Sequence, residues 1–127
     1  LCTDVTHATD TPGLSAPMYG MVNLGGGPTV THGSASHPLV VERLLQVAKK
    51  KKIEIQHEAA SRFTGTDTDT IFQSRDGVPS ALVSLPLRCM HSVIEMAAYS
   101  DVDATTNLMT GFVESLKKGE IFHQSLK

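Results

Sequence analysis

The 127-residue sequence lacks tryptophan, and phenylalanine and tyrosine together make up only 5% of it. The core must therefore be built from aliphatic side chains and methionine. The sequence also lacks an apolar run of the roughly 20 residues that a membrane-spanning helix needs, and no stretch has the pattern of a secretory signal. Its formal net charge of −2 gives no electrostatic attraction to nucleic acid or to an anionic membrane. We therefore expect neither of these as a partner.

Cysteine is scarce as well, since Cys2 and Cys89 are the only two. Without a secretory signal, two cysteines indicate free thiols in a reducing compartment, so we expect reduced thiols and a cytoplasmic location. The chain opens on Leu1 rather than methionine and enters an apolar stretch at once. This start suggests a piece of a longer polypeptide.

Hydrophobic periodicity predicts alternating strands and helices in a chain long enough for one domain. The expected strands cover residues 1–6, 29–31, 53–59 and 81–87, and the expected helices cover residues 37–52, 66–75 and 102–118. This order indicates an α/β fold in which helices cover a mostly parallel or mixed sheet. The glycine- and proline-rich segment 11–27 is expected to be a loop with a role of its own.

The best helix candidate, 37–52, has Pro38 at its start and four lysines, Lys49 to Lys52, at its end. Proline suits the first helical position, and lysines interact favourably with the negative end of the helix dipole. A lysine run can also bind nucleic acid. The slightly acidic balance of the whole chain favours the simpler interpretation, a solvated helix end.

Sequence motifs with a known mechanism are missing, including HExxH, paired CxxC, GxSxG and GxxxxGK[ST]. Two polar residues still lie where α/β folds place working groups. Asp4 falls within the first expected strand, where a metal or a cation would offset its burial, although it could also belong to a frayed chain start. His91 follows the strand at 81–87, where a ligand or a hydrogen-bonded structural histidine would both fit.

The order of several short motifs resembles the C-terminal half of the tetrahedral aminopeptidases, which include glutamyl and deblocking aminopeptidases and endoglucanase-M-like proteins. The resemblance covers nearly the whole chain. It rests on DVTHATDTPG from residue 4, LGGGPTV, IEIQHEA, Gly65-Thr66-Asp67, Ser74-Arg75-x-Gly77-Val78-Pro79 and Pro86-x-Arg88-x-x-His91-Ser92. The family likeness implies a zinc-dependent exopeptidase fold, of which residues 1–127 are the C-terminal portion of a single catalytic domain.

The resemblance implies a metal-dependent aminopeptidase that uses two divalent ions, zinc or cobalt, and acts on peptides. Asp4 and His91 match two of the family's five metal ligands. Gly65, Thr66 and Asp67 match a wall of its substrate pocket, although Asp67 could instead cap a helix. The remaining ligands, the general base and the inserted assembly domain precede the matched region. We therefore expect this chain alone to be inactive and the intact enzyme to be a homo-oligomer.

Four further positions fall within the family pattern, two that match it and two that depart from it. Asp10 and Glu95 match it and are expected to support the site rather than bind metal. Cys89 stands where a tyrosine is usual and is expected near the metal-side pocket, and Asp69 stands where a small or basic residue is commoner. The other histidines are expected to be surface or structural residues: His7, His32, His37, His57 and His123.

Two other functions remain open. A non-catalytic α/β binding or assembly module could keep the fold without the metal centre. A glycoside hydrolase would need two carboxylates that flank a sugar, and the sequence nominates no such pair.

Overall fold

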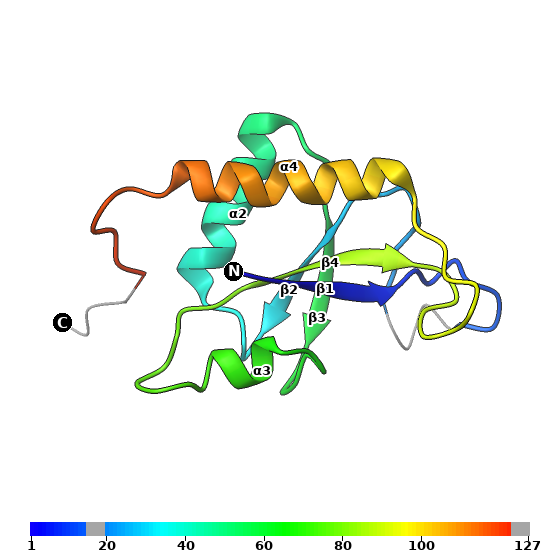
Figure 1. Cartoon of the computed structure of the whole chain (residues 1–127), viewed down its shortest axis with the longest axis horizontal. Coiled ribbons are helices and arrows are strands. Elements are labelled where there is room, and N and C mark those ends of the chain that lie inside the picture. The colour runs from blue at the N-terminus through cyan, green and yellow to red at the C-terminus, as the bar shows by residue number, and fades with distance from the viewer. Residues whose placement is uncertain (15–19, 123–127) are drawn as a thin grey trace.

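The computed structural model describes residues 1–14 and 20–122, which form a four-stranded sheet with helices (Figure 1). The strands are β1 (Cys2–His7), β2 (Thr29–Gly33), β3 (Gln56–Ala60) and β4 (Leu82–Leu87). The helices are α2 (Pro38–Lys51), α3 (Thr68–Ile71) and α4 (Tyr99–Ser115). The expected α/β class is confirmed.

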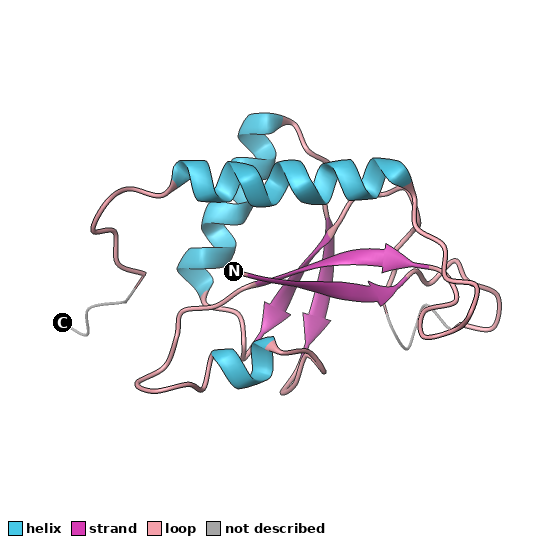
Figure 2. Ribbon diagram, viewed as in Figure 1, coloured by secondary structure: helices cyan, strands magenta, loops and turns pink. Residues whose placement is uncertain are grey.

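The sheet is mixed, with strand order β1-β4-β2-β3 (Figure 2). β1 runs parallel to β4 and β2 runs parallel to β3, whereas β2 and β4 are antiparallel. The carboxyl ends of β1 and β4 therefore lie at one end of the sheet, and those of β2 and β3 lie at the opposite end. β1 pairs with β4 over its full length, from Cys2↔Leu82 to His7↔Leu87, so the chain start is not frayed.

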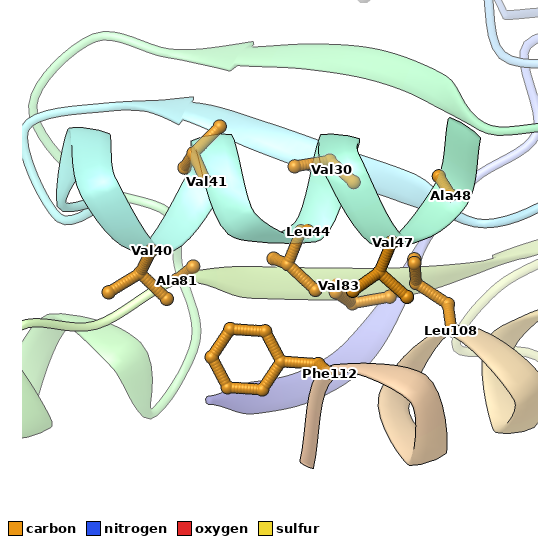
Figure 3. Packing of buried hydrophobic residues seen from close by; sticks show 10 residues of the cluster. All are labelled: Val30, Val40, Val41, Leu44, Val47, Ala48, Ala81, Val83, Leu108 and Phe112. Carbon is orange, nitrogen blue, oxygen red and sulfur yellow. The ribbon is translucent and has the colours of Figure 1, made fainter. Parts of the chain in front are cut away.

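Aliphatic side chains from α2, α4 and the two central strands form the core (Figure 3). Val30 of β2 and Val83 of β4 are fully buried, as are Leu44 of α2 and Leu108 of α4. Burial of one such side chain contributes about 1.5–3 kcal/mol. Phe112 closes the cluster from α4. The core agrees with the expectation of an aliphatic interior.

Helix α2 begins at Pro38 and ends at Lys51, within one residue of the prediction at each end. His37 occupies the N-cap position but makes no side-chain capping bond. Lys49, Lys50 and Lys51 lie in the last turn, where they interact favourably with the helix dipole. Lys51 also pairs with Glu114 of α4 at 2.8 Å. The lysines are thus accounted for as a helix end.

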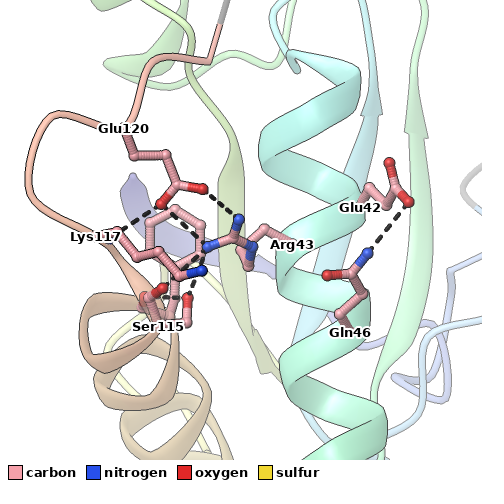
Figure 4. A network of polar contacts seen from close by, with 7 residues as sticks. Glu42, Arg43, Gln46, Ser115, Lys117 and Glu120 are labelled. Carbon is pink, nitrogen blue, oxygen red and sulfur yellow. Dashed lines mark hydrogen bonds and ion pairs between the residues drawn. The ribbon is translucent and has the colours of Figure 1, made fainter.

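Helix α4 spans Tyr99–Ser115 rather than residues 102–118. Leu116 already has an extended backbone, so the helix ends before the predicted residue 118. Arg43 of α2 donates to the Ser115 carbonyl at 3.1 Å and pairs with Glu120, which draws the segment after α4 back onto α2 (Figure 4). This arrangement satisfies a carbonyl at the helix end with a side chain from another element.

The apolar spacing predicted for this helix was only partly correct. Leu108 and Phe112 are buried, but Val102, Val113 and Leu116 are 40%, 64% and 41% exposed. Only the side of α4 that faces α2 and the sheet is buried by other residues of this chain.

Near its start, α4 also fixes the loop that precedes β2. The fully buried Asp101 accepts hydrogen bonds from the backbone N–H groups of Gly25 and Gly27, at 2.7 and 2.9 Å. Gly27 has a φ of +86°, and a Cβ there would lie 2.1 Å from the Glu54 carbonyl oxygen. The glycine run is therefore a close-packed turn between α4 and the segment that leads into β3.

β3 begins at Gln56, three residues later than predicted, because Ile53 and Ile55 belong to the connection from α2. Both isoleucines still pack against the core from outside the strand. Helix α3 covers four residues instead of the predicted ten. Residues 72–76, which follow it, form turns and a bend.

Cys2 and Cys89 are both free, as predicted, and Cys2 opens β1. In the two ranges that the structure describes, no helix is long and apolar enough to cross a membrane.

Candidate functional site

A pocket of about 280 Å³ collects residues from all four strands, from the loop 64–66 and from the loop after β4. Asp4 and His91, which lie far apart in the sequence, both line it. The structure therefore brings together the two residues that the sequence nominated as metal ligands.

Asp4 reaches the pocket from the middle of β1, where it is half-buried and pairs in register with Ser84 of β4. Asp4 therefore lies within a paired strand, and the alternative of a frayed chain start is wrong. Its Oδ1 accepts a hydrogen bond from the Val5 N–H at 2.8 Å. A carboxylate at this place stands on a rigid element, because β1 is paired along its length.

His91 lies in the loop that connects β4 to α4, and two reciprocal backbone hydrogen bonds close this loop at its base. They join Arg88 and Met96, at 3.0 and 3.1 Å. Inside the loop, the His91 N–H donates to Glu95 Oε1 at 2.6 Å.

Two residues of the same loop, Cys89 and His91, have positive φ angles of 53° and 63°. For residues other than glycine this conformation costs about 1–2 kcal/mol, and such strain gathers at functional sites. Cys89 lies two residues from His91 and is next to Met90, which also lines the pocket.

An ion pair ties this loop to the segment that follows β1. Arg88 pairs with Asp10, and this hydrogen bond holds the pKa of the Asp10 carboxyl below its usual value while raising the pKa of Arg88. Asp10 and Glu95 thus both position the loop that carries His91. This agrees with the supporting role expected of them.

The loop 64–66 forms another wall of the pocket, with Gly65 and Thr66 among the lining residues. Asp69 holds it in place, because its carboxylate accepts hydrogen bonds from the N–H groups of Thr64 and Gly65 at 2.9–3.0 Å. The Thr64 backbone contact is the main reason why the pKa of Asp69 lies below its usual value.

Asp67 is not among the pocket-lining residues. It occupies the N-cap position of α3 but makes no side-chain capping bond, so the alternative role as a helix cap is wrong.

Sequence reasoning missed Glu58 of β3, which lines the same pocket. Hydroxyl groups of Thr6, Thr29 and Thr31 donate to its carboxylate at 2.6, 3.2 and 3.3 Å. His7, at the end of β1, lines the pocket as well. The signal in the sequence is the alternation of polar residues along the strands, which places these side chains on the face opposite the apolar ones.

The strand register shows why this face of the sheet is polar. Asp4 is paired with Ser84, and Ser84 is paired with Thr29. Val30 and Val83, the next residues along, point into the core on the opposite face. The pocket therefore lies on the sheet face that α2 and α4 leave uncovered.

The described residues do not supply enough ligands for a complete metal site. Within the described parts of the chain, no three histidine, cysteine, aspartate or glutamate residues are grouped so that they could hold a metal ion. Asp4 and His91 offer one hard oxygen and one imidazole nitrogen, a mixture that suits zinc. A complete metal centre needs further ligands from outside the described residues.

Comparison with known proteins gives consistent matches. A lysyl aminopeptidase of Pyrococcus furiosus is 40% identical over 94 residues, which are 74% of this chain and 27% of that protein. An aminopeptidase of Desulfurococcus kamchatkensis has a similar structure, with a TM-score of 0.78 and 31% identity over 90% of this chain and 33% of that one. A TET aminopeptidase from a marine-sediment Thaumarchaeota archaeon matches with a TM-score of 0.79 and 25% identity, over 90% and 32% of the two chains.

The chain spans about a third or less of the length of these relatives. Residues 1–108 match the family described as M42 glutamyl aminopeptidase. The family match covers both Asp4 and His91 and most of the fold. The chain therefore belongs to the M42 glutamyl aminopeptidase family.

Proposed function

We propose that this chain supplies part of the active site of a metal-dependent aminopeptidase that removes N-terminal residues from peptides. The observation that carries the proposal is the meeting of Asp4 and His91 in one pocket, on a paired strand and on a closed loop. In this proposal residues 1–127 are the C-terminal portion of a single catalytic domain.

Asp4 and His91 would each hold one of two divalent ions, zinc or cobalt. Such a pair supplies an activated water and polarises the scissile carbonyl. The protein's part is to keep the two donors fixed. For Asp4 this is done by the β1–β4 pairing, and for His91 by the Arg88–Met96 bridge together with Asp10 and Glu95.

Gly65 and Thr66 are proposed to contact the peptide, because their loop forms a wall of the pocket and Asp69 makes it rigid. Asp67 was nominated with them, and its place outside the pocket lining leaves it a role only through the loop. Glu58 adds a second carboxylate, so the described pocket carries acidic groups that favour a cationic occupant, either metal ions or the substrate's free ammonium group.

A homo-oligomer in the cytoplasm completes the proposal. Free cysteines support the compartment. Exposed apolar side chains in one stretch support an association surface: Val93, Ile94, Met96 and Tyr99. The alternative, a non-catalytic module, predicts no role for Asp4 and His91 in activity.

The test is a chimera in which this chain replaces the matching segment of the Pyrococcus furiosus lysyl aminopeptidase. We expect chelator-sensitive hydrolysis of lysyl-p-nitroanilide. The substitutions Asp4→Asn and His91→Gln should each lower kcat/KM by more than about a hundredfold, because each removes a metal ligand.

Matched controls are Asp103→Asn, on the exposed side of α4, and His32→Gln, outside the pocket. Both should leave the activity unchanged. An active chimera that tolerates Asp4→Asn and His91→Gln would rule out the proposed ligands, and an inactive but folded chimera would favour the non-catalytic module.

A further inference from the structure

Two histidines on neighbouring strands, His32 of β2 and His57 of β3, face each other outside the pocket. His32 Nε2 and His57 Nδ1 lie 2.9 Å apart, and the ring centroids are 5.1 Å apart. In register, His57 pairs with Val30 and His32 pairs with Ala59, so the two histidines are diagonal neighbours on one face. Diagonal neighbours are within reach of long side chains.

The facing nitrogens have the spacing that a shared ligand needs. In neutral rings one N–H donates to the other ring's lone pair. The acceptor ring already carries its proton on its far nitrogen, so only the donor ring's proton must move to the far nitrogen of that ring to free both facing lone pairs, with no net change in charge. A tetrahedral ion with metal–nitrogen bonds of about 2.0–2.1 Å separates two ligand nitrogens by about 3.3 Å. His32 Nε2 and His57 Nδ1 would therefore have to move apart by only a few tenths of an ångström.

Accessibility and charge also favour a cation here. Both histidines are exposed, and β3 is an edge strand, so water can complete the coordination. His32 borders a hollow that also includes Glu42 of α2, which adds a negative charge. Desolvation and the neighbouring His57 lower the pKa of His32, which favours the neutral ring that can bind a metal.

We propose that His32 Nε2 and His57 Nδ1 form a second, surface metal site for an imidazole-preferring divalent ion such as zinc or nickel. The ion would bridge β2 and β3 at the edge of the sheet. With two protein ligands and water, the site is open and exchangeable, unlike a closed structural zinc site. It shares no residue with the pocket that holds Asp4 and His91.

The first test follows the imidazole nitrogens of the whole chain by long-range 1H–15N NMR during titration with zinc chloride. We expect coordination shifts at His32 Nε2 and His57 Nδ1, with the protons retained on the other nitrogen of each ring. Shifts confined to other histidines would overturn the proposal. This measurement needs no substitution.

The second test is calorimetric titration with nickel chloride. His32→Gln and His57→Gln should each weaken binding by about a hundredfold, because the second ligand binds intramolecularly in the intact pair. The double variant should bind no more weakly than either single one. Unchanged affinity in a folded single variant would contradict a two-histidine site.

A double variant of the other pocket, Asp4→Asn with His91→Gln, serves as the control and should leave nickel binding unchanged. If it removes the binding instead, the ion belongs to that pocket and the surface site is refuted. The proposed peptidase function could fail without affecting this result, because no residue is shared.

Discussion

At the scale of single residues, carboxylates that range from fully buried to exposed hold the loops of this molecule in place. Asp101 is fully buried and holds the glycine run, Asp69 holds the loop 64–66, and Glu95 holds the backbone of His91. In each case a carboxylate satisfies backbone N–H groups that would otherwise lose hydrogen bonds on leaving water. Their loss has consequences that can be measured separately.

Replacement of Asp101 by alanine is expected to destabilise the fold by about 2–4 kcal/mol. The buried Gly27 N–H would be left unsatisfied, which costs about 1–3 kcal/mol, and the more exposed Gly25 N–H would lose its charged acceptor as well. Urea unfolding measures the change. Asp103→Ala, two residues along on the exposed side of α4, is the matched control and should change stability by less than about 0.5 kcal/mol. Equal effects of the two substitutions would show that the hydrogen bonds from Gly25 and Gly27 to Asp101 contribute nothing to the free energy of unfolding.

The hydrogen bonds to Asp69 should make the loop 64–66 sensitive to acid. The folded-state pKa is depressed below the ordinary 3.8, so this stabilisation is fully present above the unfolded-state pKa and is lost as pH falls through the lower folded-state value. The amide protons of Thr64 and Gly65 should titrate with that lower pKa in NMR spectra. Asp69→Asn should abolish the titration, whereas Asp67→Asn should leave it intact. Amide shifts that follow Asp67 would contradict this assignment.

At the scale of elements, the contact between α2 and α4 depends on a glycine inside a helix. A Cβ at Gly111 would lie 2.7 Å from Val47 Cγ1 and 2.8 Å from Lys51 Cε. The lysine end can move, but Val47 is buried and its β-branched side chain has little rotamer freedom. The two helices approach closely because position 111 has no side chain.

Gly111→Ala is therefore expected to destabilise the chain by about 1–3 kcal/mol through overpacking. This sign is the reverse of the helix-propensity effect, which favours alanine over glycine by up to about 1 kcal/mol. Asn107→Ala, at an exposed position of the same helix, isolates that propensity term and should be neutral or stabilising. Thermal or urea unfolding of both variants measures the two effects. A stabilised Gly111→Ala variant would show that α2 and α4 can move apart without a cost in free energy.

The elements could largely be predicted from the sequence, and their ends could not. The strand at 81–87 and helix α2 were predicted within one residue, because a long apolar run and a proline start are local signals. α4 was misplaced by three residues, since its ends depend on Arg43 and Asp101, whose partners are distant in the sequence. β3 starts at Gln56 because its N–H meets the Pro28 carbonyl at 2.8 Å, a contact that no local pattern reveals.

At the scale of the whole molecule, the candidate site is a consequence of strand order. Asp4 and His91 share a pocket because β1 lies beside β4, and Glu58 joins them because β3 carries it to the same uncovered face. Periodicity alone gave no reason to pair residues so far apart, and only the resemblance to a family nominated two of them. Glu58 and His7 lie within motifs that carry the resemblance, but the sequence gives neither of them a role in the site, so only the sheet register places them in the pocket.

The last prediction is that the 127-residue chain alone has no appreciable aminopeptidase activity. A catalytic zinc usually needs three protein ligands besides an open position, and no group of three metal-ligating residues exists in the described ranges 1–14 and 20–122. The resemblance places the family's general base before the matched region, so a bound water would also lack the proton acceptor that the family uses. The assay measures hydrolysis of aminoacyl-p-nitroanilides with added zinc or cobalt, and the active chimera is the positive control. Robust turnover by the isolated chain, abolished by chelator, would show that these 127 residues build a complete metal centre. In that event Glu58 and His7, which already line the pocket with Asp4 and His91, would be the first residues to replace.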